Sequence, residues 1–263
     1  MRDLLRKCSV ADMEFIVRTL ECSFNLSDDK GMRRGLEEYE ELGTKQAQDA
    51  LAQAIERELR YAGSADLAYL FRWLFDADNA GVKVNEIITD VAKKLKVKLK
   101  PVGTVEAKLE RLVKGAFETS FSKLTPEQQR KLLEDAGVGK ATIEDIMGKL
   151  KVVGPVMVIP LVIKKVGVKA AEKVVTQITV GLIGKFIGTQ AAKELVKQMA
   201  TKFPVWAEWL GPVAWVFTGV WLALDLQSAA LRKTAPTLLY LGLVGLRDGP
   251  EDGPGFWEDE DNG

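Results

Sequence analysis

The side chains that most often carry enzyme chemistry are sparse in this chain. It has 263 residues and no histidine. Without imidazole, Ser/His/Asp and Cys/His pairs, His-ligated zinc or haem, and a histidine pH switch are all excluded. Carboxylate chemistry stays open, but no spacing marks an arranged pair of Asp or Glu residues. We therefore expect a non-enzymatic protein with no catalytic residue, no cofactor and no metal.

Three short stretches come close to ligand-binding motifs. Residues 76–81 begin like a calcium loop, but Ala80 and Ile87 stand where oxygen ligands are needed. Residues 139–140 resemble the end of a phosphate loop that lacks its first glycine and its hydroxyl. A Gly-x-Gly turn within 133–146 resembles a helix-hairpin-helix element, yet its acidic neighbours oppose a phosphate backbone. We favour helix ends and a helix–helix turn, and expect no nucleic-acid partner.

The two cysteines, Cys8 and Cys22, are too far apart for a disulfide if they share one helix. Fourteen residues of helix span about 21 Å. Charged residues near the start interrupt any apolar run that could act as a secretion signal. We expect reduced thiols and a cytoplasmic protein, with the inner face of the membrane as a place of association.

Helical periodicity dominates the first part of the chain. Apolar residues recur at three- and four-residue steps through 45–60, 64–75, 84–97 and 104–122. These stripes predict amphipathic helices that pack their apolar faces together as a bundle.

Pairs of residues three apart mark the expected starts of further helices. A hydroxyl residue followed three positions later by an acid or amide is typical of a capping box. Three such pairs are Ser9 with Asp12, Thr125 with Gln128, and Thr142 with Asp145.

The balance of 37 basic and 37 acidic residues conceals a strong charge polarity along the chain. Residues 248–263 carry seven acids and no base, so the remainder has a net charge of +7. Residues 151–202 carry nine lysines and two glutamates, so this segment alone has a net charge of +7, equal to that of the whole remainder. The tail is expected either to dock on this lysine-rich segment and mask it, or to remain a disordered solubilising tail.

Four uncharged or nearly uncharged runs follow residue 151, at 152–163, 174–192, 209–224 and 235–246. None reaches the roughly 18 uncharged residues of a confident membrane span. Two states fit them: helices buried in a core, or helices that lie on or insert into a membrane with lysines at anionic head groups.

We predict an all-α fold, a multi-helix bundle in three regions. Residues 1–150 form a polar helical region, 151–247 an apolar region rich in lysine, glycine and tryptophan, and 248–263 an acidic tail. A ridge of small residues is expected to allow close helix packing, at Gly184, Gly188 and Ala192.

The preferred function is membrane interaction, peripheral or by conditional insertion of the C-terminal region. The expected partner is an anionic membrane surface. The alternative is a soluble chaperone or adaptor that binds a protein partner. Assembly of the chain into a homo-oligomer is compatible with either function. The expected lipid or partner contacts are Lys164, Lys165, Lys169, Lys173, Lys185, Trp209, Trp215 and Trp221.

Several pieces of the chain form a familiar pattern, at residues 3–12, 58–64, 81–95, 104–137 and 231–237. The last of these looks like a basic-then-proline turn before a final apolar helix. With these pieces the chain resembles the YaaW-like family of uncharacterised bacterial proteins, sometimes grouped near ubiquinol-cytochrome c chaperones. Ser64 and Val84 depart from the family's pattern, and the acidic tail is extra. The resemblance implies an all-helical bacterial fold without established catalytic residues, and the chaperone grouping implies a binding role in respiratory-complex assembly.

Overall fold

The computed structural model describes residues 1–21, 29–63, 82–188 and 229–257, and all regular structure in these ranges is helical. The expected all-α class is therefore confirmed. The elements are α1 (Arg2–Arg6), α2 (Val10–Glu21), α3 (Asp29–Leu42), α4 (Lys45–Ala62), α6 (Val84–Leu95), α7 (Val105–Phe121), α8 (Pro126–Asp135), α9 (Lys140–Val153), η2 (Pro155–Met157), α10 (Val158–Lys165), α11 (Val168–Ile187), α14 (Ala229–Arg247) and η4 (Pro254–Trp257).

Local signals placed several helix starts correctly. At α2, the Ser9 backbone N–H donates to the Asp12 carboxylate at 2.7 Å, and the Asp12 N–H donates back to the Ser9 hydroxyl. At α8, Thr125 and Gln128 form the same reciprocal box, with proline at the first helical position. Each box pairs two backbone N–H donors that the start of a helix would otherwise leave without partners.

The third expected box, at Thr142, is wrong. α9 begins two residues earlier, with Gly139 as its N-cap, so Thr142 already lies in the first turn. Gly137 has a φ of 89° in the turn that joins α8 to α9. Because that backbone conformation suits glycine, the helix can restart directly after the turn. The interpretation of 133–146 as a helix–helix turn is confirmed.

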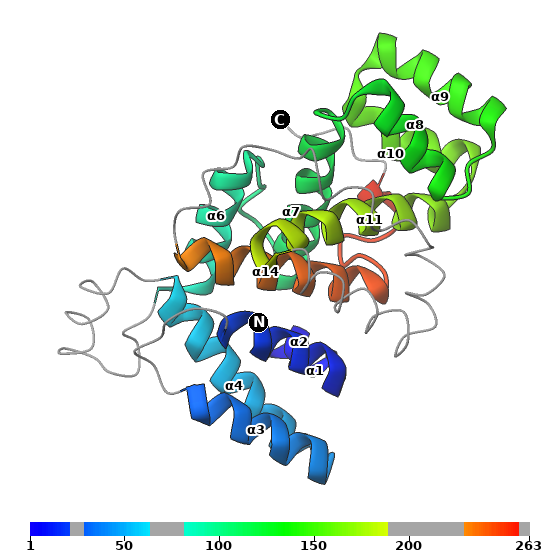
Figure 1. Cartoon of the computed structure of the whole chain (residues 1–263). Coiled ribbons are helices and arrows are strands. Elements are labelled where there is room, and N and C mark those ends of the chain that lie inside the picture. The colour runs from blue at the N-terminus through cyan, green and yellow to red at the C-terminus, as the bar shows by residue number, and fades with distance from the viewer. Residues whose placement is uncertain (22–28, 64–81, 189–228, 258–263) are drawn as a thin grey trace.

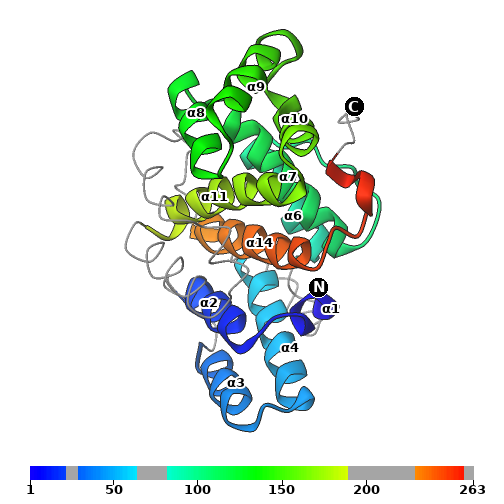
Figure 2. The ribbon, with the colours of Figure 1, turned by 90° about the vertical axis from the view of Figure 1, so that its right-hand side faces the viewer.

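Helix α14 occupies the middle of the fold. It packs against α7 and α11 on one side and against α2 and α4 on the other, as Figures 1 and 2 show. Leu238, Leu239 and Leu241 are fully buried, and so is Val244. A helix that is apolar all round needs cover on every side, and this central position provides it. The run at 235–246 is therefore buried in the core.

The expected division into a polar and an apolar region is not confirmed, because both share one hydrophobic core. Leu51 and Ile55 of α4 belong to the same cluster as Val175 and Ile183 of α11. The stretch at 231–237 is not a turn: α14 runs through it with Pro236 inside the helix. Packing on several sides holds the helix together where proline removes one backbone hydrogen bond.

Two glycines of α14 let it approach α7 closely. A Cβ on Gly242 would lie 2.5 Å from the backbone oxygen of Leu109, and one on Gly245 would lie 3.0 Å from the Glu110 carboxylate. These two glycines are not the small-residue ridge expected from the sequence. In that ridge, Gly188 is the C-cap of α11 with a φ of 89°, and Ala192 lies outside the described residues. That ridge stays a prediction. In the described part of the chain, no helix is both long enough and apolar enough to span a bilayer.

A candidate anion-binding site

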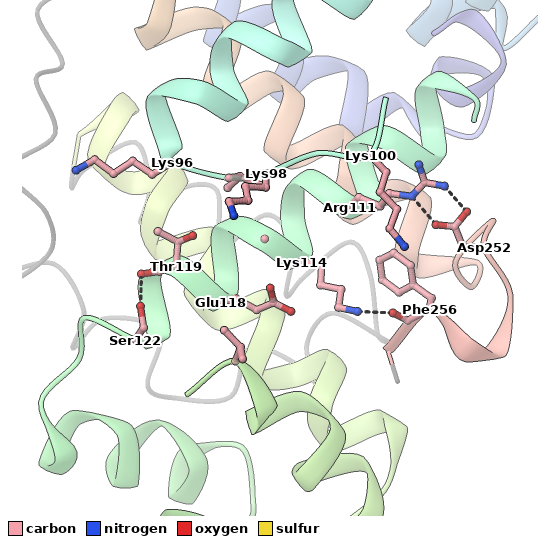
Figure 3. Close-up of a pocket in the computed structure, with 13 residues that line it drawn as sticks. Lys96, Lys98, Lys100, Arg111, Lys114, Glu118, Thr119, Ser122, Asp252 and Phe256 are labelled. Carbon is pink, nitrogen blue, oxygen red and sulfur yellow. Dashed lines mark hydrogen bonds and ion pairs between the residues drawn. The ribbon is translucent and has the colours of Figure 1, made fainter. Parts of the chain in front are cut away.

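A basic cavity opens where the loop after α6 crosses α7. Its volume is about 530 Å³, and Figure 3 shows the side chains around it. This size is within the range of small-ligand pockets, roughly 300–1,000 Å³. The residues that line it come from four separate segments of the chain: Lys96, Val97, Lys98, Lys100, Arg111, Lys114, Gly115, Glu118, Thr119, Ser122, Val156, Asp252 and Phe256.

The loop contributes three lysines through an alternating pattern. Lys96 caps α6 in the left-handed conformation, with a φ of 61°, and residues 97–100 follow without regular structure. Burial alternates along this loop. Val97 is buried, while Lys96, Lys98 and Lys100 are exposed. Lys98 and Lys100 reach toward α7, whereas Lys96 points away (Figure 3).

Gly115 of α7 allows the loop to lie on the helix. A Cβ at this position would lie 2.3 Å from Cγ1 of Val97, so a larger residue would push the loop away. This close approach places the loop lysines over the part of α7 that carries Arg111, Lys114 and Glu118. Those three residues follow at steps of three and four and therefore share one face of the helix.

The C-terminal segment 248–257 forms another wall. The Arg111 guanidinium donates two hydrogen bonds to Asp252, from Nε at 2.6 Å and from Nη2 at 2.7 Å. These bonds lower the pKa of Asp252 below its ordinary value. Lys114 Nζ donates to the Phe256 carbonyl oxygen at 2.6 Å and lies 5.3 Å from the centroid of the Phe256 ring.

The described part of the tail, residues 248–257, is docked on the fold. Phe256 and Trp257 are buried, so residues 248–257 are not a disordered tail. The hydrogen bonds of Asp252 and of the Phe256 carbonyl go to α7, outside the lysine-rich segment 151–202. α7 offers a guanidinium and an ammonium that match the carboxylate and the carbonyl of the tail. Residues 258–263 lie outside the described part of the chain.

The electrostatics of the cavity favour anions. Five cationic side chains line it against two carboxylates, Glu118 and Asp252. Burial raises the pKa of Glu118 to about 7, although the ammonium of Lys114 acts in the opposite direction. Near neutral pH, part of the population therefore carries an uncharged Glu118, which leaves the site still more positive.

An exposed valine lines the cavity. Val156 of η2 is 51% exposed, and Val152 and Val153, which end α9 shortly before it in the chain, are 86% and 51% exposed. Val102 is 64% exposed, and its carbonyl oxygen accepts a hydrogen bond from Arg111 at 2.6 Å. An exposed apolar rim beside a basic cavity is a surface that can accept an amphiphile with an anionic head group.

The lysines predicted as contacts lie mostly at the turn between α10 and α11. Lys164, Lys165 and Lys169 are exposed there, next to the exposed Val166 and Val168. Lys165 Nζ lies 2.9 Å from the Asp145 carboxylate.

The other predicted contacts do not join this group. Lys173 is half-buried farther along α11, and Lys185 is half-buried in its last turn, where burial lowers the pKa to about 8. Trp209, Trp215 and Trp221 lie outside the described residues.

The predicted contacts do not include the cavity residues Arg111, Lys114 and Lys98. One local signal was available, the alternation of lysine with apolar residues at 95–100. Nothing local relates it to α7 or to Asp252, which is 141 residues from Arg111.

Sequence comparison finds relatives of unknown function. One, from Helicobacter pylori strain J99, is 24% identical over 196 residues, which cover 74% of this chain and 71% of the relative. Another, from strain 26695, is 22% identical over 193 residues, which cover 73% of this chain and 87% of the relative. Both are named UPF0174 proteins.

These relatives correct the expected resemblance to the YaaW-like family, which no comparison supports. The quoted pieces of that resemblance are short helical patterns without a chemical signature, and such patterns recur in unrelated helical proteins. No family profile matches the chain. No solved structure matches it either.

Proposed function

We propose that this protein is a non-enzymatic, peripheral membrane-binding protein that contacts anionic lipid through the face carrying the basic cavity. The observation that carries the proposal is the juxtaposition of five cationic side chains with an exposed valine rim. Lysine and arginine near an anionic bilayer each contribute about 1 kcal/mol of attraction. Valines beside them can enter the boundary between head groups and acyl chains.

The turn between α10 and α11 supports the same function. Its three exposed lysines flank two exposed valines within six residues, 164–169. Buried valines would contribute to the core, whereas these two contact solvent next to cationic groups. Conditional insertion of the C-terminal region stays a prediction, and residues 189–228 of that region lie outside the described part of the chain.

Flotation with lipid vesicles tests the proposal. We expect binding to vesicles that contain phosphatidylglycerol, no binding to pure phosphatidylcholine, and loss of binding as salt is raised. Failure to bind anionic vesicles at low salt would refute the proposal and favour the protein-binding adaptor.

A charge-reversal pair locates the contact surface. The double variant Lys98→Glu/Lys100→Glu reverses two charges at the cavity and should weaken anionic-vesicle binding by at least about tenfold. Lys93→Glu/Lys94→Glu makes the same change in charge on the exposed side of α6, away from the cavity lining. Equal losses in both variants would show that net charge alone drives binding and would exclude the cavity as the contact surface.

A further inference from the structure

The carboxylate of Asp252 occupies the position that a bound anion would take in the cavity. Arg111 holds it with two parallel hydrogen bonds of 2.6 and 2.7 Å. The planar guanidinium fork binds a phosphate group with the same geometry. Arg111 therefore already presents its donors in the arrangement that phosphate recognition needs.

Lys114 is the second cation that the docked segment engages. The side chain is buried, and the tail supplies a neutral carbonyl oxygen at 2.6 Å from its Nζ. The ammonium also acts on the nearby carboxylates of Glu118 and Asp252. A phosphate oxygen in place of the carbonyl would accept the same ammonium hydrogen bond and add a negative charge, which strengthens the attraction.

One feature weakens the docking of the tail, although the Glu251 N–H donates to Glu110 at 2.9 Å. Trp257 is buried, and its indole Nε1 has no hydrogen-bond acceptor in the described part of the protein. Burial of a polar atom without a partner costs free energy, which favours displacement of the segment.

The backbone of the segment suits release as one unit. Gly249 and Gly253 have φ values of 95° and 81°, on either side of Asp252. A Cβ on either glycine would meet nothing within 4 Å, so the space around both glycines is open. Asp252 and Phe256 are four residues apart, and a ligand that displaced one would draw away the other.

We propose that Arg111 and Lys114 form a binding site for the phosphate group of an anionic lipid, and that segment 248–257 is its internal competitor. This inference rests on the membrane binding proposed above and adds to it the ligand group, the two residues that hold it, and an autoinhibited state. The segment covers Arg111 and Lys114 until a phosphate group replaces the Asp252 carboxylate.

Asp252→Asn tests the competition, because it keeps the shape of the side chain and removes its charge. We expect the affinity for phosphatidylglycerol vesicles to rise about fivefold, as one charge near a membrane surface allows. Glu38→Gln is the matched control, since it removes one exposed negative charge on α3, outside the cavity lining. Arg111→Lys keeps the positive charge, loses the fork, and should bind more weakly than the wild type.

Amide hydrogen exchange measures directly whether segment 248–257 is released. Vesicles of phosphatidylglycerol should speed amide exchange in the peptide that covers 248–257, and chloride at matched ionic strength should not. Inorganic phosphate serves as a probe without lipid. If it speeds exchange while vesicles have no effect, the site binds free phosphate and the lipid assignment is overturned.

The two proposals fail in distinguishable ways. Wild-type protein that does not bind anionic vesicles refutes the membrane function. Wild-type protein that binds them, together with equal affinities for Asp252→Asn and Glu38→Gln, refutes the competition alone. Unchanged exchange of 248–257 with both vesicles and phosphate also refutes the competition.

Discussion

The Oη atom of Tyr240 lies 2.6 Å from Oδ1 of Asp12 and donates a hydrogen bond to it, across 228 residues of sequence. Both side chains are buried. Arg247 reaches the other carboxylate oxygen at 3.2 Å, and the Ser9 N–H reaches the same oxygen at 2.7 Å. The residue that caps α2 therefore also fixes α14 against it, and the docked segment begins directly after Arg247.

Tyr240→Phe should destabilise the protein by about 1–3 kcal/mol, because the buried carboxylate of Asp12 loses a donor. The free energy of unfolding from urea titration measures the effect. Tyr39→Phe removes a hydroxyl from a half-buried tyrosine on α3 and serves as the control. Equal costs for the two variants would show that the hydrogen bond to Asp12 contributes nothing specific.

Gly242→Ala should destabilise the protein by about 1–3 kcal/mol, because its Cβ collides with the backbone of α7 and the helices must separate. Gly148→Ala is the matched change. It lies on an exposed face of α9, where a Cβ would meet nothing within 4 Å. This control should stabilise by about 0.5–1 kcal/mol, as alanine does in a helix. Thermal unfolding of both variants checks the contrast, which disappears if α14 and α7 do not pack this closely.

Glu110→Gln should stabilise the protein more at pH 8 than at pH 5. Burial raises the pKa of Glu110 from 4.5 to about 7, although the hydrogen bond from the Glu251 N–H acts in the opposite direction. A carboxyl group with a raised pKa in the folded state makes the protein lose stability as pH rises from about 4.5 to about 7. Glutamine cannot ionise, and its carbonyl oxygen can still accept the Glu251 N–H.

The gain from Glu110→Gln should therefore grow through that window and level off above it, at about 3 kcal/mol or less because solvent screens part of the charge. Urea unfolding at several pH values measures it. A gain that does not depend on pH would contradict the assigned titration of Glu110. Glu38→Gln should change stability little throughout.

Glu118→Gln should remove a pH dependence of vesicle binding. Protonation of Glu118 below about pH 7 takes one negative charge out of the cavity, so wild-type binding should strengthen as pH falls from 8 to 6. One charge corresponds to about fivefold in affinity near an anionic surface. Flotation at both pH values, with the lipid composition held constant, measures the ratio. A variant that keeps the full pH dependence would assign it to another group.

Local sequence determined most of the individual helices. The stripes at 45–60, 84–97 and 104–122 match α4, α6 and α7 to within two residues, because periodicity and caps act within a few turns. Thr142 failed as a cap because a glycine turn just before it offered an earlier start. The pattern at 231–237 failed as a turn because burial within α14 outweighed the local effect of Pro236.

The composition of an apolar segment does not show whether protein or lipid will surround it. The run at 235–246 fitted both a buried helix and a membrane helix, and the packing of α14 among α2, α4, α7 and α11 decided for burial. Composition also did not show which charged groups would pair. The sequence has seven acids after Arg247 and nine lysines within 151–202, yet the docked part of the tail binds Arg111 and Lys114 on α7.

The sequence alone thus determined the helical class and the bounds of several helices, since hydrogen bonds and caps that span three or four residues set them. The tertiary structure decided which charges meet. Asp12 and Tyr240, and likewise Arg111 and Asp252, lie far apart along the chain. They come together only when the whole core closes, and the absence of histidine leaves the candidate site to lysine, arginine and carboxylate chemistry.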